Sequence, residues 1–414
     1  MEMKRVEEAI KERLQMLRTF TSTPGHGVTR LPFSNEARRA ADYLKEEMEK
    51  AGLTSVWMDA VGNVRGRLEA DEPETQTIMM GSHYDTVKNG GAYDGIAGVV
   101  CAIETAKAIK RSGMHRRYAL EIIAFNDEEG MMFGSGCLGS KALMGMVDQN
   151  DIRRLNDENG ISIEEWMHRW GSRPEEIPAL ALDADQIRAF FEIHIEQGPV
   201  FDAGGKEIGI VDCIVGLLRC MVTVRGRADH AGTTPMHMRR DAIGIASKVI
   251  SRLDQLADSQ DNGSVATCGF IRAYPNAMNV IAETCEFTMD LRSREEESIE
   301  RMMAEAETIL KDCCAETGAG YEVDIKLRQK PVAMSRPIMD ILCETCRENE
   351  YSFQKMISGA AHDSMIFADK TETAMVFVPS REGRSHCPQE YSEYGHLAKA
   401  VKIVYETIVK MNQE

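Results

Sequence analysis

The sequence predicts an α/β protein with a mainly parallel sheet, into which a smaller α+β domain is inserted. Largely apolar runs at 77–83 and 118–126 alternate with helical segments, which is typical of parallel strands covered on both faces. After about residue 212 the strands alternate apolar and polar side chains, as in a sheet with one solvated face. The predicted domains are residues 1–212 with 329–414, and residues 213–328.

The elements of both domains follow from this periodicity in chain order. In the first domain we expect helices at 2–18, 35–52 and 99–112, strands at 77–83, 118–126 and 189–198, and, after the insertion, a strand at 374–380 and a helix from about 395. The inserted segment predicts a strand at 218–230, a helix at 237–257, strands at 264–272 and 283–292, a helix at 295–316 and a strand at 320–328. This β-α-β-β-α-β order is that of a ferredoxin-like unit.

Composition restricts the partners that the chain can have. Among 414 residues, 49 Lys and Arg stand against 66 Asp and Glu, and the formal net charge is −17. A chain this acidic is a poor candidate for non-specific binding to nucleic acid or to an anionic membrane surface. No run approaches the roughly 18 apolar residues of a membrane helix, and the charged N-terminus lacks the features of a signal peptide. We therefore expect no nucleic-acid or membrane partner.

The cysteines indicate a reducing compartment. Their number, 11, is odd, and they are scattered along the chain, which argues against a disulfide framework and for the cytoplasm. Cys343 and Cys346 form a C-x-x-C within a helical run. We interpret them as ordinary helix cysteines, with a redox or metal role as the alternative.

Histidines and carboxylates gather where the predicted strands end. His83 and Asp85 end one strand, Asp94 follows in a glycine-rich turn, and Glu128 and Glu129 end the next strand; His194 and His386 end or follow two more. Ligands bind at this edge of an open α/β sheet. A mixed nitrogen and oxygen set suits Zn²⁺, Mn²⁺ or a similar ion, and Asp85 can accept a hydrogen bond from the His83 ring.

Each of these signals has a simpler reading. A single strand histidine is more often structural or exposed, and an acidic pair such as Glu128–Glu129 is usually a solvated turn. Two adjacent carboxylates at a strand end are nevertheless costly unless a cation neutralises one of them. Taken together, the residues favour a metal site, and by themselves they leave the reaction open.

The motifs closely resemble those of the allantoate amidohydrolase and N-carbamoyl-L-amino-acid hydrolase branch of the dinuclear M20-type metallopeptidases. They occur in order from about residue 27 to 391: GVTRLPFS, GSHYDT, GGAYDG, NDEEG, EIHIEQGP, ADHAGTTPMHMRRDA, SGAAHDS and VPSREGRSHCPQE. The resemblance implies a zinc-exopeptidase-like catalytic domain and an inserted ferredoxin-like lid and dimerisation domain. It also implies two divalent ions per subunit, Mn²⁺ or Zn²⁺, with Ni²⁺ and Co²⁺ also tolerated.

The resemblance assigns a role to each residue at the strand ends. One ion would be held by His83, Asp94 and His194, and the other by Asp94, Glu129 and His386, with Asp94 bridging. Glu128 would be the general base, and Asp85 would orient His83. Further residues would bind substrate: Gln197, Asn279, Arg292, Gly359, Ala360 and His230, the last from the partner subunit of a homodimer, where it stabilises the oxyanion.

The expected enzyme is thus a cytoplasmic amidohydrolase that cleaves the carbamoyl (ureido) C–N bond of a small carboxylate. The leading substrate is an N-carbamoyl-L-amino acid, hydrolysed to the amino acid, CO₂ and ammonia. Allantoate and ureidoglycolate are alternatives. A dipeptidase or aminoacylase of the same superfamily would typically replace His194 by a carboxylate. A binding protein with a relic site would not need the intact Glu128.

Overall fold

The computed structural model describes residues 1–73 and 75–413. The chain divides into two compact units, the first comprising Met1–Asp212 and Ala333–Glu414 and the second Cys213–Val332. Among the described residues, no helix has both the length and the apolar character needed to cross a membrane. No cysteine in the described part of the chain forms a disulfide.

The first unit is built on one large sheet with the strand order β1-β2-β4-β3-β5-β14-β6-β12, with β13 paired to β6. Its central strands β4, β3, β5 and β14 run parallel to one another, and β2 and β6 pair antiparallel with β4 and β14. The expected α/β fold with a mainly parallel sheet is confirmed. The strands are Ser55–Met58, Val64–Leu68, Thr77–His83, Ala119–Phe125, Ile187–Ile195, Ile208–Ile214, Val332–Ala333, Phe353–Ser358 and Thr373–Val378, for β1 to β6 and β12 to β14.

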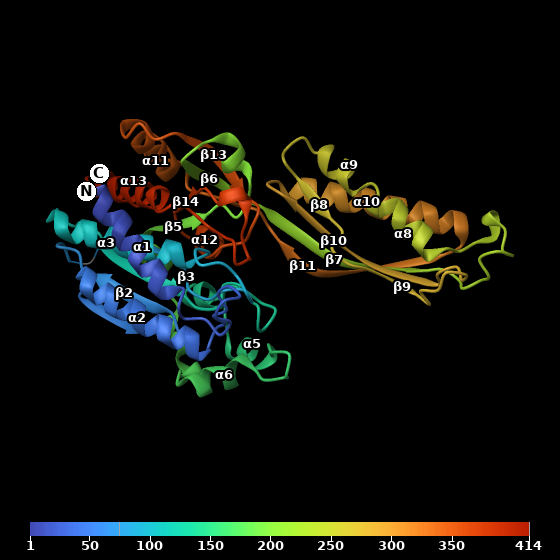
Figure 1. Cartoon of the computed structure of the whole chain (residues 1–414), viewed down its shortest axis with the longest axis horizontal. Coiled ribbons are helices and arrows are strands. Elements are labelled where there is room, and N and C mark those ends of the chain that lie inside the picture. Colours follow the sequence, from blue (N-terminus) through green and yellow to red (C-terminus); the bar gives the residue numbers. More distant parts are fainter. Residues whose placement is uncertain (74, 414) are drawn as a thin grey trace. The chain divides into compact units, whose positions relative to one another are not determined.

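Helices cover both faces of this sheet. On one face α2 packs on β1 and β2, α3 on β3, β4 and β5, and α13 on β14, while α1 packs on α3 and α13 (Figure 1). α12 packs on β5 and β14, and α4 on β4. The helices are α1 Met3–Leu17, α2 Asn35–Ala51, α3 Ile96–Ser112, α4 Leu138–Leu143, α5 Gln149–Arg154, α6 Ile163–Trp170, α7 Val200–Gly204, α11 Arg336–Glu348, α12 Asp363–Ala368 and α13 Tyr394–Met411.

The parallel register brings several strand ends to one edge. His83, the last residue of β3, lies opposite Phe125, the last residue of β4. On the other side of the sheet centre, His194 of β5 lies opposite Phe377 of β14. β3, β4 and β14 are buried along their whole length, and β5 is buried except at Arg188, so the sheet provides a firm platform for the side chains that follow.

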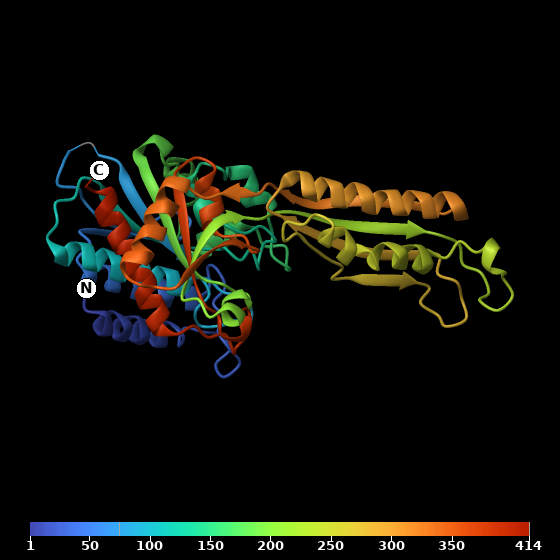
Figure 2. The same cartoon turned by 90° about the horizontal axis from the view of Figure 1, so that it is seen from above.

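The second unit is an antiparallel sheet covered by helices. Its strands are β7 Gly216–Arg225, β8 Val265–Thr267, β9 Ile271–Tyr274, β10 Thr284–Ser293 and β11 Gly320–Gln329, in the order β11-β7-β10-β8 with β9 also on β10. The helices are α8 Ala242–Ile250, α9 Leu253–Asp258 and α10 Glu296–Thr317. Figure 1 and Figure 2 both show α10 running along the length of these strands.

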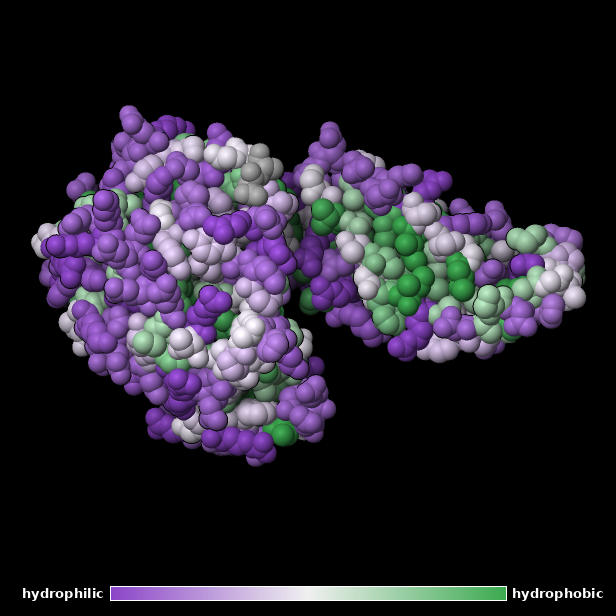
Figure 3. Space-filling model, viewed as in Figure 1, coloured by the Kyte–Doolittle hydropathy of each residue, from purple (hydrophilic) through white to green (hydrophobic). Residues whose placement is uncertain are grey.

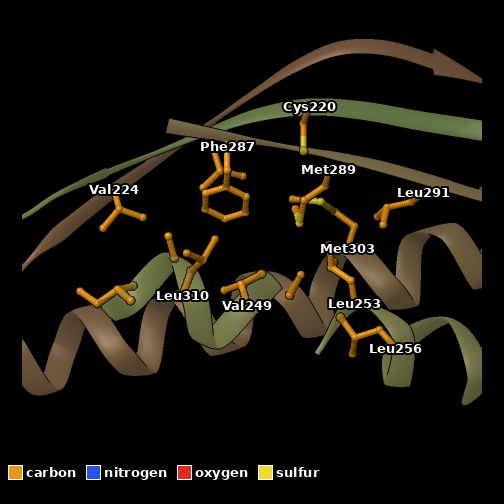
Figure 4. Close-up of a cluster of buried hydrophobic side chains, with 14 of the residues drawn as sticks. Cys220, Val224, Val249, Leu253, Leu256, Phe287, Met289, Leu291, Met303 and Leu310 are labelled. Atoms are coloured by element: carbon orange, nitrogen blue, oxygen red, sulfur yellow. The ribbon is translucent and has the colours of Figure 1, made fainter. Parts of the chain in front are cut away.

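The alternation in β10 explains the core of the second unit. Every second residue of β10 is buried, including Cys285, Phe287, Met289 and Leu291, and these side chains meet α8, α9 and α10 (Figure 4). Two expected elements are wrong in detail. The helix expected at 237–257 is interrupted between α8 and α9, and the strand expected at 264–272 is two short strands, β8 and β9. The short helices α4, α5 and α6 and the strands β1 and β2 were not predicted.

Candidate metal centre

Two histidine side chains from neighbouring strands of the first unit converge on one carboxylate oxygen. The Oδ1 atom of Asp94 lies 3.5 Å from Nε2 of His83 and 3.2 Å from Nε2 of His194. All three side chains are buried. Asp94 reaches the two strand ends because Gly95 follows it with φ +64°, where a Cβ atom would lie 2.4 Å from the His83 ring. A glycine is therefore required beside this carboxylate.

The second oxygen of Asp94 faces another group of side chains. Its Oδ2 atom lies 3.0 Å from Nε2 of His386, whose Nε2 also lies 3.4 Å from Oε1 of Glu129. Gln197 donates from Nε2 to the same Oδ2 over 2.9 Å. Gln197 and His386 both have left-handed backbones, with φ 59° and 55°, and such strain persists only where surrounding contacts hold it.

Two clusters thus share the carboxylate of Asp94. The ligand atoms of His83, Asp94 and His194 lie within 4.8 Å of one another, and so do those of Asp94, Glu129 and His386. Among the described residues none forms a hydrogen bond with Asp94 Oδ1, although that atom is buried. An orphaned anionic oxygen between two histidine nitrogens is the arrangement expected around a divalent cation. The residues present therefore fit an ion at each position.

Glu128 lies beside the first cluster. Its Oε2 is 3.8 Å from Nε2 of His83, and the Cys137 thiol donates to its Oε1 over 3.8 Å. The Asp85 carboxylate accepts the backbone N–H of Glu128 over 3.0 Å and that of Glu129 over 3.2 Å. The His83 Nδ1 lies 3.2 Å from the backbone oxygen of Asp85 and 3.6 Å from its Oδ1. Asp85 therefore positions the acidic pair as well as the His83 ring.

The electrostatics of the cluster reflect the crowding of its carboxylates. Burial raises the pKa of Glu128 well above its usual range against the opposing effect of His83, and the neighbouring Asp363 and Glu129 add to the rise. Burial and the nearby Asp94 raise the pKa of Glu129 to about 7. Asp94 is the exception: burial opposes its ionisation, but the close approach of His194, His386 and His83 holds its pKa well below the usual range.

The remaining expected substrate residues of the first unit lie at the mouth of this centre. A cavity of about 500 Å³ is lined by Gln197, Ala360 and His386, with Gly383, Arg384, Ser385 and Cys387. Gly359 is exposed next to Ala360. Nearby, His362 Nε2 is 2.9 Å from Ser358 Oγ, and the His362 ring lies 4.5 Å from that of His194.

The other expected substrate residues belong to the second unit, where His230 and Asn279 are neighbours. The backbone of Ala231 donates to the carbonyl of Asn279, and both His230 and Asn279 are exposed. Arg292 lies apart from them on β10 and donates to Asp290 from Nε over 2.8 Å. Its Nη2 also donates to Asp290, over 3.2 Å, so the guanidinium pairs with an internal carboxylate.

Sequence reasoning overlooked two groups that support the centre. The carboxylate of Glu390 accepts the backbone N–H groups of Tyr93 and Asp94. The carboxylate of Glu192 accepts the hydroxyls of Ser82, beside His83, and of Ser364. The period-two position of Glu192 relative to His194 was a usable signal, because both side chains point to the same face of β5. Glu390 gave no such local signal.

The chain is similar over nearly its whole length to members of one protein family. The model of peptidase family M20/M25/M40 matches residues 79–410. The chain is 38% identical over 98% of both chains to an N-carbamoyl-L-amino-acid amidohydrolase of Paenarthrobacter aurescens. It is 34% identical, again over 98% of both, to an allantoate amidohydrolase of Bacillus subtilis (strain 168). A crystal structure of a hydantoinase/carbamoylase-family amidase from Burkholderia multivorans superposes with a TM-score of 0.91 at 27% identity, covering 99% of this chain and 98% of that one.

Proposed function

The chain belongs to peptidase family M20/M25/M40, and from this premise we propose that the cluster around Asp94 is the centre of a metal-dependent amidohydrolase. One divalent ion is held by His83, Asp94 and His194, and a second by Asp94, Glu129 and His386. The observation that carries the proposal is the placement of the two Asp94 oxygens, one toward each ligand group. Similarity over the whole chain to enzymes that act on carbamoyl and ureido compounds supports it.

The reaction follows from what the side chains can do. Bound divalent ions supply an activated water and polarise the scissile carbonyl. Glu128, which lies beside His83 but is in neither ligand group of Asp94, accepts the proton of the attacking water and passes it to the leaving nitrogen. The Asp85 carboxylate accepts a hydrogen bond from the backbone N–H of Glu128, so the base is fixed relative to the end of β3.

Charge balance favours an anionic substrate. Two divalent cations against the three carboxylates of Asp94, Glu128 and Glu129 leave a local charge of about +1. The remaining positive charge suits a substrate carboxylate or the negative charge that develops on the carbonyl oxygen. Gln197 and Ala360 line the cavity, and Gly359 directly precedes Ala360; in this proposal they contact the ureido or carboxylate end of such a molecule.

The substrate proposed is an N-carbamoyl-L-amino acid. Water is added across the carbamoyl group, the C–N bonds to the carbonyl carbon break, and the products are the amino acid, CO₂ and ammonia. The 38% identity to an enzyme named for this reaction supports the choice. Allantoate is the second candidate because an enzyme named for it is 34% identical over the same length. Ureidoglycolate is a third, and a dipeptidase is disfavoured by His194 in place of a carboxylate.

We further propose that two chains form a homodimer through the second unit. β9 pairs only with β10 among the described strands and so lies at an edge of the sheet. Ile271 on this strand is 57% exposed. Ile271 lies directly opposite Phe287 in the sheet, so its side chain is on the face that the helices cover. Ile243 of α8, one of those helices, is also exposed. Figure 3 shows hydrophobic surface on this unit. An open apolar strand edge is a ready site for pairing with a second copy.

In such a dimer, His230 acts on the partner's substrate. It is exposed in its own subunit and lies beside the Asn279 segment, so the two can approach a substrate together. Arg292 would bind the substrate carboxylate. The ions are Mn²⁺ or Zn²⁺, with Ni²⁺ and Co²⁺ accepted by the same ligands. The free cysteines support residence in the reducing cytoplasm.

The deciding experiment is ammonia release from a substrate panel. The protein is stripped of metal with a chelator, reloaded separately with Mn²⁺ and Zn²⁺, and assayed on several N-carbamoyl-L-amino acids, their D-enantiomers, allantoate and ureidoglycolate. A dipeptide is assayed alongside by release of free amino acid, because its hydrolysis yields no ammonia. We expect the highest kcat/KM on an N-carbamoyl-L-amino acid and none in the chelated protein. Preference for allantoate would replace the substrate but keep the mechanism. Hydrolysis of the dipeptide alone would overturn the proposal.

A further inference from the structure

Glu390 is a buried carboxylate with three donors. Only 4% of the residue is exposed. Its Oε1 accepts the backbone N–H of Tyr93 over 2.8 Å and that of Asp94 over 3.0 Å, and its Oε2 accepts the hydroxyl of Ser385 over 2.8 Å. Both oxygens are therefore occupied by groups of the protein, and Glu390 is in none of the clusters of described residues that could hold an ion.

These bonds join two distant parts of the chain that each carry an ion ligand. Asp94 lies 296 residues before Glu390, whereas Ser385 directly precedes His386. The Ser385 hydroxyl also lies 3.2 Å from Oδ2 of Asp94. Glu390 thus fixes the backbone of one ligand and, through Ser385, the loop that bears another.

The close approach of Glu390 is built into the neighbouring backbone. A Cβ atom on Gly91 would lie 2.0 Å from Oε1 of Glu390, so only glycine leaves room for the carboxylate at this point. The loop between Gly91 and Asp94 therefore lies directly on Glu390, which accepts two of its backbone N–H groups.

The two ion positions differ in how much they depend on this contact. The first takes His83 and His194 from buried strands of the central sheet. The second takes His386 from a loop, with the side chain 49% exposed and the backbone at φ 55°. Two of the three ligands of the second position, Asp94 and His386, are held by Glu390, directly or through Ser385.

We propose that Glu390 is a positioning residue that sets the affinity of the second ion position, formed by Asp94, Glu129 and His386, far more than that of the first. The inference rests on the two-ion assignment of the proposed function. It adds a residue that is not itself an ion ligand but determines ion affinity. Outer partners that orient ligands typically contribute 10- to 100-fold, roughly, to metal affinity. Glu390 acts through Asp94 and His386 and does not touch the substrate.

The test is a titration of the whole chain with Co²⁺ after its metal has been removed with a chelator. Binding is monitored by calorimetry and by visible absorption. We expect wild type to bind two ions per chain. In Glu390→Ala the affinity of the second ion falls about 10- to 100-fold, while that of the first changes about threefold or less. Ser385→Ala should weaken the same ion by a smaller factor. The matched control is Glu393→Gln, an exposed glutamate three residues on that pairs with Arg381.

The outcomes separate this inference from the assignment it rests on. Two ions with unchanged affinities in both Glu390→Ala and Ser385→Ala would overturn the role of Glu390 alone. Equal weakening of both ions, with a matching fall in the melting temperature of the ion-free protein, would mean a merely structural role and would also overturn it. Fewer than two ions in wild type would overturn the two-ion assignment itself. If Glu390→Ala does not fold, Glu390→Gln and Ser385→Ala decide by the same criteria.

Discussion

The backbone N–H of Glu128 donates to Oδ1 of Asp85 over 3.0 Å. This bond joins the segment after β3 to the segment after β4, so the proposed base is held by the strand that carries a proposed ion ligand. Asp85 is fully buried, and its other oxygen accepts the N–H of Glu129. A carboxylate is needed here because both of its oxygens must accept hydrogen bonds.

Asp85→Asn should therefore impair both folding stability and turnover. The amide presents an NH₂ group to one of the two N–H donors, which leaves a buried donor unsatisfied at a cost of about 1–3 kcal/mol. We expect that loss in the free energy of unfolding by urea, and a fall in kcat larger than the change in KM. Asp71→Asn, at an exposed ion pair with Arg116, is the control. A stable variant with normal kcat would contradict the positioning role of Asp85.

Glu128→Gln should abolish turnover while leaving ion content intact. The amide cannot accept the proton of the water, and general-base catalysis contributes about 10²- to 10⁴-fold. Glu129→Gln, the adjacent substitution, should instead lose the second ion because Glu129 is one of its proposed ligands. Metal analysis of the purified variants beside an ammonia-release assay distinguishes the two. Near-normal turnover by Glu128→Gln would sink the mechanism.

Cys137 is predicted to tune the orientation of Glu128. Its thiol donates to Oε1 of Glu128 over 3.8 Å, its N–H donates to the carbonyl of Glu128 over 3.0 Å, and its backbone is left-handed at φ 59°. Cys137→Ala removes the thiol donor, and we expect kcat to fall about fivefold, the equivalent of one weak hydrogen bond. Cys137→Ser should recover part of this. Cys346→Ala, at another buried cysteine, should leave kcat unchanged; an equal loss there would refute a local effect.

Subunit mixing tests whether His230 acts on the partner's substrate. Glu128→Gln and His230→Ala homodimers should each be nearly inactive. If His230 acts across the dimer, half of the sites in each mixed dimer are intact, and random mixing should restore about a quarter of wild-type activity. The mixture is assayed after exchange of subunits. No recovery, or a fully active monomer in sedimentation, would show that each chain uses its own His230.

The buried ion pairs of Arg13 should be a main stabilising contact between the first three helices. Arg13 of α1 donates to Glu47 of α2 over 2.7 Å and to Glu104 of α3 over 2.5 Å. Arg13→Met should lower the free energy of unfolding by about 3 kcal/mol, the lower end for a broken buried pair, because Lys107 still pairs with Glu104. Urea unfolding measures this. Arg5→Met, at an exposed pair, should cost less than about 1 kcal/mol, and a similar loss in both would contradict the prediction.

The fold class was predictable because strand periodicity is a local property of the chain. The strands β3 and β4 are largely apolar and are buried on both faces, whereas buried and partly exposed residues alternate along β10. The residue pattern of each strand therefore indicates which of its faces are buried. Short elements were missed for the same reason. The helices α4, α5 and α6 comprise 6, 6 and 8 residues, too few to show a clear helical period, and they form through packing on the rest of the unit.

The amino-acid sequence by itself determined which chemical groups stand at the ends of the strands: His83, His194 and the acidic pair follow or end buried strands, and parallel pairing must bring those ends to one edge of the sheet. Tertiary structure alone decided how they are held. The division of the two Asp94 oxygens between histidine groups, the double acceptance by Asp85 and the contact of Glu390 with Asp94 join segments as far as 296 residues apart. Such contacts leave no periodic trace in the chain, because they depend on how loops are packed against one another after the sheet has formed.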